Sequence, residues 1–138
     1  MVRKKFYFDT AIWVDYYEER RDKSKFLGEI AYSLLKKVIK SKGTIIVSGL
    51  ILRELETLYS LDEINGLFFP FEGCLRIVEI KQSQVEESAK LALERNIPKG
   101  DALHAILARD NDAVLVTRDK HFELLSDVCI VKKPEDLL

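Results

Sequence analysis

The chain has 138 residues, close to the usual size of one domain, so we expect a single domain over residues 1–138. Hydrophobic residues make up 47% and charged residues 33%, which is too apolar for a disordered chain and too interrupted by charge for a membrane span. The formal net charge of -1 excludes a general attraction to nucleic acid, so any such binding must use a local patch. The N-terminus has no apolar stretch long enough for a signal peptide, and we therefore expect a cytoplasmic protein without membrane contact.

Five short segments rich in β-branched, aromatic and aliphatic residues predict strands. In chain order they are residues 4–8, 44–48, 76–80, 113–117 and 129–132. Apolar residues at helical spacing predict helices over residues 24–41, 83–96 and 101–110, and a further helix that starts just after the second strand. Residues 61–74 form the least regular segment. Apolar strands that alternate with helices favour parallel pairing, so the expected class is α/β, with the strand order left open.

Several classes of site are disfavoured by the motifs that the chain lacks. Cys74 and Cys129 are far apart, without a CxxC pair or clustered histidines, which disfavours a zinc site or a redox pair. No glycine-rich phosphate loop is present. A receiver domain would need further acids at the first turn and an Asp closing the third strand, and a haloacid-dehalogenase-type phosphatase would need Asp-x-Asp, but Asp9 is followed by Thr10 and Ala11.

Four acidic residues fall where predicted strands end or where the following helices begin. Asp9 comes directly after the first strand, Asp119 follows the fourth, Asp101 opens a helix, and Glu54 lies in the helix after the second strand. Ligands of open parallel sheets bind beyond the carboxyl ends of the strands, so these four side chains could converge there. An isolated Asp at a helix start is usually a cap and one after a strand is usually a turn residue, so the joint placement carries the prediction.

A group of carboxylates without buried cations repels itself and attracts a hard cation. Mg2+ or Mn2+ suits such oxygen ligands and commonly joins carboxylates to substrate phosphates. The chemistry that follows is hydrolysis of a phosphodiester. This set of acids therefore predicts a metal-dependent nuclease.

The sequence resembles PIN-domain proteins, in particular the VapC-type toxin ribonucleases of bacteria and archaea. The resemblance covers nearly the whole chain and rests on "FDT" at Asp9, "LRELE" at Glu54, "DALHAILA" at Asp101 and "VTRDKHF" at Asp119. It implies a three-layer α/β/α sandwich with a central parallel sheet of four to five strands, and metal-dependent cleavage of RNA. It also implies a cognate antitoxin and a homodimer.

The same resemblance implies roles for individual residues. Asp9 and Asp101 would be the principal metal ligands, completed by Glu54 and Asp119 directly or through water. Thr10 and Thr117 match polar positions that line the site. One departure is a long helical segment over residues 18–42 that begins with the basic run "RRDKSK".

Other residues near the acids have less specific roles. His104 lies one turn beyond Asp101 and could act as a base or support a ligand, although packing in the core is an alternative. His121 is expected at the surface. Four basic residues neighbour the acids in the sequence: Arg53, Lys99, Arg118 and Lys120. They could contact RNA phosphates, or they could be ordinary solvated charges.

Three functions remain open from the sequence. The preferred one is a Mg2+- or Mn2+-dependent endoribonuclease that acts as the toxin of a toxin-antitoxin pair. The alternatives are a degenerate PIN or receiver-like binding module without nuclease activity, and a PIN nuclease of RNA processing. Four intact acids favour an active enzyme.

Overall fold

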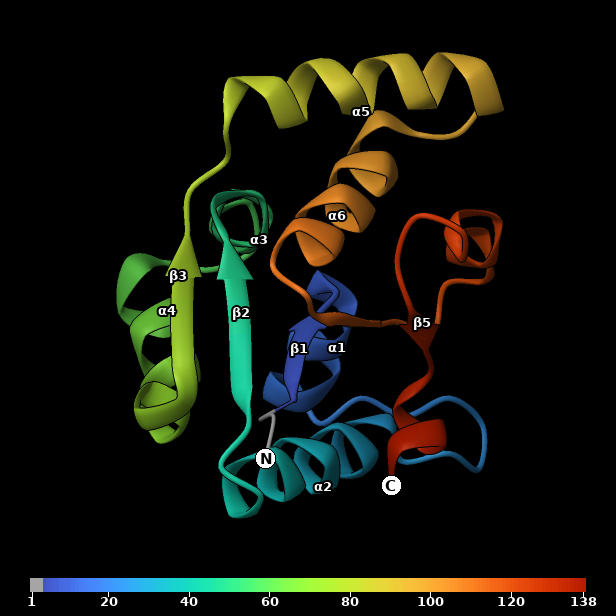
Figure 1. Cartoon of the computed structure of the whole chain (residues 1–138). Helices are drawn as coiled ribbons and strands as arrows, with labels where there is room; N and C mark the ends of the chain where they lie inside the picture. The colour runs from blue at the N-terminus through green and yellow to red at the C-terminus, as the bar shows by residue number, and fades with distance from the viewer. Residues whose placement is uncertain (1–3) are drawn as a thin grey trace.

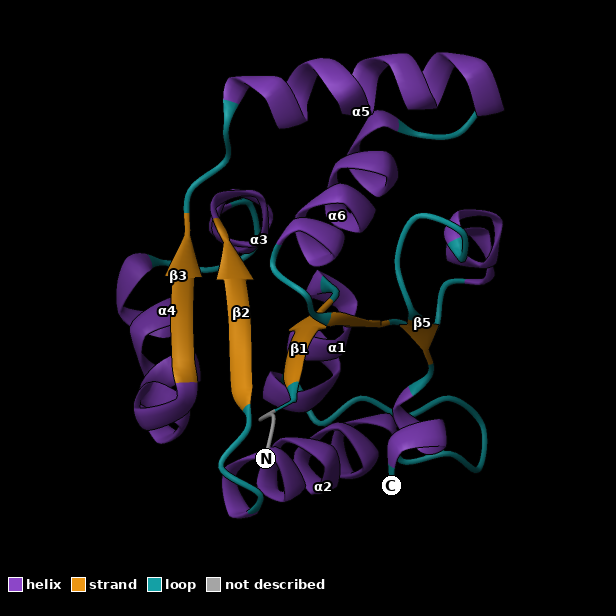
Figure 2. Cartoon of the chain, viewed as in Figure 1, coloured by secondary structure: helices purple, strands orange, loops and turns teal. Residues whose placement is uncertain are grey.

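The computed structural model describes residues 4–138, and its strands occur where the sequence predicts them (Figure 1). The strands are β1 (Lys5–Phe8), β2 (Thr44–Ser48), β3 (Leu75–Val78), β4 (Val114–Val116) and β5 (Val131–Lys132). The α-helices are α1 (Thr10–Tyr17), α2 (Leu27–Lys40), α3 (Gly49–Glu56), α4 (Leu61–Phe68), α5 (Gln82–Arg95) and α6 (Lys99–Asp110). Short 3-10 helices are η1 (Phe69–Cys74), η2 (Lys120–Leu125) and η3 (Pro134–Leu137), so short strands are surrounded by helical chain (Figure 2).

The five strands form one parallel sheet in the order β3-β2-β1-β4-β5. Right-handed crossovers from β1 to β2 and from β2 to β3 place α1 to α4 on one face, and α1 packs on α2 and α3. The crossover from β3 to β4 runs the other way, and α5 and α6 therefore pack together on the opposite face. The expected α/β/α arrangement is confirmed.

The strand order, which the sequence leaves open, fixes where the chain reverses its direction across the sheet. The connection after β1 leads toward β2 and the connection after β4 leads toward β5, and these two strands are neighbours. The connections that leave the carboxyl ends of such a pair run to opposite sides, which leaves a crevice between them. Asp9 follows β1 and Asp119 follows β4, so both acids lie at this crevice.

An aromatic cluster fills the core between the sheet and the helices α1 and α4. Trp13 is fully buried, and its ring centroid lies 4.9 Å from that of Phe68 and 5.8 Å from that of Phe8, both in edge-to-face orientation. The two helices α1 and α2 also approach closely at Gly28, where a Cβ would lie 2.6 Å from the carbonyl oxygen of Asp15. Trp13 therefore serves the core, and Gly28 is required by the contact between the helices.

Three segments differ from the sequence-based expectation. The helix expected over 18–42 begins only at Leu27, because Lys23 has a left-handed backbone (φ 56) and residues 22–25 form a small turn closed by an antiparallel bridge. The irregular segment 61–74 is helical, since the hydroxyl of Ser60 and the carboxylate of Glu63 form a reciprocal cap at the start of α4. The strand β1 is followed almost directly by α1, with only Asp9 between them, and the sequence analysis does not predict this helix.

Within residues 4–138, none of the helices combines the length and the apolar character that crossing a bilayer requires.

Candidate metal centre

Asp9 is held between β1 and α1 by its own backbone and by both carboxylate oxygens. Its N–H donates to the carbonyl of Val116 on β4 at 3.0 Å. Oδ1 accepts from the N–H of Ala11 at 3.1 Å, so Asp9 caps α1. Oδ2 accepts from the hydroxyl of Thr117 at 2.6 Å. The side chain therefore begins a helix and also lies against the end of β4.

Thr117 joins Asp9 to Asp119. Its hydroxyl oxygen is buried and, while donating to Asp9, accepts from the N–H of Asp119 at 3.0 Å. Asp119 Oδ1 in turn accepts from the N–H of His121 at 2.9 Å and caps η2. Thr117, predicted to line the site, thus fixes the distance between two of the four acids.

Asp101 lies in the first turn of α6, where Pro98 and not Asp101 occupies the N-cap position. Its carboxylate makes no hydrogen bond or ion pair with any residue of the described range 4–138, and helix capping therefore does not explain it. Ligand atoms of Asp101, Asp119 and His121 all lie within 4.8 Å of one another. Burial, followed by the negative charges of Asp119 and Asp9, raises the pKa of Asp101 above its ordinary value.

Glu54 reaches the crevice from α3 and is held by two donors. The hydroxyl of Thr10 donates to Oε1 at 2.5 Å, and Nε2 of His104 lies 2.9 Å from the same oxygen. Partial burial raises the pKa of Glu54, but the hydrogen bonds from His104 and Thr10 outweigh it, and the pKa lies below its ordinary value. Glu54 is therefore kept as a carboxylate.

A buried chain of hydrogen bonds supports Glu54 from inside the sheet. Nδ1 of His104 lies 2.7 Å from the hydroxyl of Tyr7 on β1, which lies 2.7 Å from the hydroxyl of Ser48 on β2. Glu54 is a carboxylate and can only accept, so Nε2 of His104 is the donor to it, Nδ1 is left to accept from Tyr7, and the Tyr7 oxygen accepts from Ser48. Tyr7 then donates to His104, whose Nε2–H donates to Glu54.

Tyr7 and Ser48 are the residues of this site that the sequence analysis does not single out. Tyr7 is fully buried, and burial raises its pKa far above the ordinary value, so its hydroxyl keeps its proton. The signal was a hydroxyl between Phe6 and Phe8 in a strand that is otherwise apolar, because a buried polar group needs a partner. His104 is both packed in the core and in contact with an acid, which joins the two alternatives of the sequence analysis.

The donor set fits a small divalent cation. The ligand atoms that lie within 4.8 Å of one another belong to Asp101, Asp119 and His121, whereas Asp9 and Glu54 are not part of this group. No cationic side chain of residues 4–138 forms an ion pair with Asp9 or Asp101. Such uncompensated negative charge, part of it removed from water, is the environment in which Mg2+ or Mn2+ binds.

The basic residues predicted beside the acids differ in their surroundings. Nη1 of Arg118 donates to Glu135 at 2.9 Å, and Nε lies 3.8 Å from the buried Asp15, so the guanidinium faces two protein carboxylates although Nε and Nη2 make no hydrogen bond to a described residue. Lys120 is exposed and lines a cavity of about 180 Å³ beside Asp119. The lining includes four cationic residues, Arg118, Lys120, Lys132 and Lys133, and three acidic ones, Asp119, Glu123 and Asp136. Arg53 and Lys99 are exposed.

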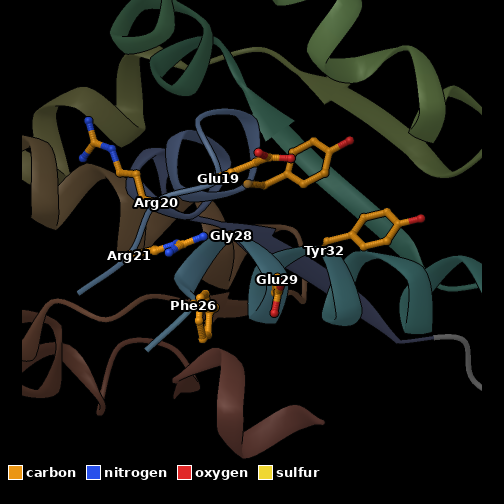
Figure 3. Close-up of a pocket in the computed structure, with 8 residues that line it drawn as sticks. Glu19, Arg20, Arg21, Phe26, Gly28, Glu29 and Tyr32 are labelled. Carbon is orange, nitrogen blue, oxygen red and sulfur yellow. The ribbon is translucent and has the colours of Figure 1, made fainter. Parts of the chain in front are cut away.

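A larger pocket of about 390 Å³ lies between α1, the start of α2 and the loop that joins them (Figure 3). The guanidinium of Arg21 lies 4.7 Å from the ring centroid of Phe26, and the ring of Tyr32 stacks on Tyr16. None of the four acids lines this pocket. It is therefore a separate surface feature and not part of the acidic crevice.

The comparison with family models matches the chain to the PIN domain over residues 6–128. This range includes all four acids and all of the hydrogen-bonded network around them. The search of curated proteins returned no match.

Several solved structures share the fold over nearly their full length. VapBC2 from Rickettsia felis, bound to a DNA fragment from its promoter, has a TM-score of 0.68 at 21% identity, covering 94% of this chain and 98% of the other. A toxin-antitoxin complex from Klebsiella pneumoniae has a TM-score of 0.64 at 21% identity, covering 94% and 97%. FitAcB from Neisseria gonorrhoeae has a TM-score of 0.63 at 17% identity, covering 96% and 99%. At these identities the likeness is one of fold.

Proposed function

Because the chain belongs to the PIN domain family, we propose that it is a Mg2+- or Mn2+-dependent endoribonuclease and the toxin of a toxin-antitoxin pair. The observation that carries the proposal is Asp101, a partly buried carboxylate without a protein partner in the described chain, placed beside Asp119 at the crevice between β1 and β4. A helix-capping role does not account for this carboxylate, because Pro98 holds the N-cap position of α6. A cation that also binds a phosphate supplies the missing partner.

In this proposal Asp9, Glu54, Asp101 and Asp119 hold the cation. When bound, the cation would neutralise charge on the scissile phosphate and lower the pKa of an attacking water. Thr117 fixes the separation of Asp9 and Asp119, and Thr10 and His104 hold the carboxylate of Glu54. These contacts keep the oxygens in place before the substrate arrives, which limits reorganisation during the reaction.

RNA is the substrate that we propose, and exposed cationic residues beside the acids support it. Lys120, Lys132 and Lys133 line the cavity next to Asp119 and form no ion pair with a described residue. Their charges can attract the phosphates of nucleotides that flank the cleaved bond. Because the formal net charge of the chain is -1, the rest of its surface provides no general attraction for RNA, and we expect RNA to bind at this patch.

The proposed partners are a cognate antitoxin and a second copy of the chain. The solved structures with this fold include a toxin-antitoxin complex and VapBC2 on its promoter DNA, which supports the antitoxin. Large apolar side chains exposed on the described surface, among them Leu93 (85%) and Phe69 (70%), support protein contacts of this kind. We expect such a ribonuclease to act in the cytoplasm as one domain.

The direct test is incubation of total RNA with the purified protein and Mg2+ or Mn2+, followed by mapping of the cut sites. Asp9→Asn is the inactive variant of choice, because Asn still caps α1 while the carboxylate is lost. The exposed Asp22, whose carboxylate makes no hydrogen bond or ion pair with a described residue, provides the matched Asp22→Asn control. Cleavage should be abolished by EDTA and by Asp9→Asn but not by Asp22→Asn, and Asp9→Asn as active as wild type would refute the proposal.

Substrate contact is tested separately with the inactive Asp9→Asn protein and a single-stranded RNA. Replacing both Lys132 and Lys133 by Gln should weaken binding and reduce the slope of log affinity against log salt by about 0.7 for each phosphate contact that is lost. An unchanged slope would remove these lysines from the RNA-binding surface without affecting the assignment of the acids.

A further inference from the structure

Among the described residues Asp101, Asp119 and His121, which are close enough together to share an ion, His121 alone offers a nitrogen, although the sequence places it as an ordinary surface residue. Its ring lies at the start of η2, with its side chain 72% exposed. Nδ1 lies 3.3 Å from Oδ1 of Asp119, and a ring nitrogen lies within 4.8 Å of the carboxylate of Asp101 as well.

These separations match the spacing of ligands around one small cation. With bonds of about 2.1 Å in octahedral geometry, adjacent ligand atoms lie about 3.0 Å apart and opposite ones about 4.2 Å apart. The Asp119–His121 pair at 3.3 Å resembles an adjacent pair, and the other two separations are no greater than 4.8 Å. Rotation of the exposed ring about its side-chain torsions can shorten the two separations that involve its nitrogen.

The backbone around His121 holds this arrangement. Asp119 Oδ1 accepts from the N–H of His121 at 2.9 Å, and Phe122 is buried, so the turn that carries His121 is anchored on both sides. Asp119 is also tied to Thr117 and through it to Asp9. The imidazole is therefore attached to the same rigid turn as one of the acids.

We propose that His121 is a direct ligand of the metal centre and shifts its preference from Mg2+ toward Mn2+. This inference rests on the metal site of the proposed function and adds a ligand that the four acids do not include. Mg2+ takes oxygen ligands almost exclusively, whereas an imidazole nitrogen binds first-row transition ions well. A centre with carboxylates and one imidazole thus discriminates between the two ions.

The chain offers a direct spectroscopic test because it contains only two histidines. Mn2+ is added to the full-length protein with either natural or 15N-labelled histidine, and electron spin-echo envelope modulation records nitrogen coupled to the ion. We expect an isotope-dependent coupling in wild type that is absent in His121→Gln, which retains His104 as the internal control. His121 is exposed, so this substitution leaves the fold intact.

Affinity gives an independent readout. Titration calorimetry should show the Kd for Mn2+ rising about tenfold or more in His121→Gln, because loss of a residue that only orients a ligand already costs about 10–100-fold in metal affinity. The Kd for Mg2+ should change far less. An equal change for both ions would overturn the proposed preference.

The outcomes separate this inference from the proposed function. Mn2+ binding without a histidine isotope effect would exclude His121 as a ligand and leave the four acids as the metal site. A coupling that persists in His121→Gln would assign the nitrogen to His104 and also overturn the inference. Wild-type protein that binds no Mn2+ at all would overturn both proposals.

Discussion

Replacing Tyr7 by Phe removes one oxygen atom from the centre of the sheet and leaves the ring in place. Tyr7 is fully buried, and its hydroxyl accepts from Ser48 and donates to His104, both at 2.7 Å. After the substitution, the hydroxyl proton of Ser48 and Nδ1 of His104 lose their partners away from water. A buried group left unsatisfied costs about 1–3 kcal/mol, so we expect about 2–6 kcal/mol for the pair.

This loss can be expressed as a melting temperature. An unfolding entropy of about 2.1 cal/mol/K per residue gives about 0.29 kcal/mol/K for 138 residues, so Tm should fall by about 7–21 °C. Calorimetry at neutral pH in EDTA provides the measurement. Tyr32→Phe is the control, since Tyr32 is 47% exposed and its hydroxyl makes no hydrogen bond to a described residue. If both variants melt within about 2 °C of wild type, the hydrogen-bonded chain does not stabilise the fold.

The same stability assay tests three other features. Asp101→Asn should raise Tm in EDTA at pH 7, because a carboxyl whose pKa is raised by folding destabilises the protein as the pH rises through that pKa. The gain in Tm should vanish near pH 3, where the carboxyl is protonated in both states. The control Asp22→Asn should show no such gain. Mn2+ at a hundred times its Kd should stabilise wild type by about 2.7 kcal/mol, or about 9 °C, and stabilise Asp101→Asn much less; equal shifts would place the ion elsewhere. Gly28→Ala should cost about 1–3 kcal/mol because its Cβ meets the carbonyl of Asp15, whereas Gly66→Ala in α4, with nothing within 4 Å, should be neutral or stabilising; equal effects would contradict the close packing of α1 on α2.

The sequence predicts the sheet well because each strand is a short apolar segment bounded by turns or helix starts. The order of the strands depends on contacts between distant residues, such as Tyr7 with Ile46 and Leu115, and a local pattern carries no record of them. The helix α1 is missed for a different reason. Its residues Ile12, Trp13 and Val14 are all buried, so the helix lacks the polar face by which periodicity identifies one.

The four acids are predicted as a set, but the reasons for their positions are only partly predicted. Helix capping was the alternative explanation for Asp101, yet Asp9 and Asp119 are the caps. The support of Glu54 by Tyr7 and Ser48 requires three elements to meet and is not visible in any one segment. Whether the four acids bind a metal stays a prediction.

Two of the four acids cap helices and Asp101 does not, and this difference has an evolutionary consequence. A descendant that no longer needed catalysis would still keep Asp9 and Asp119, because losing a helix cap costs about 1 kcal/mol. Asp101 has no such duty in the described chain, and its replacement would relieve repulsion. In relatives that have lost the catalytic activity, Asp101 should therefore be substituted before Asp9 and Asp119. Among relatives of this chain, an intact aspartate at the start of α6 is a better mark of retained activity than the two aspartates that also cap helices.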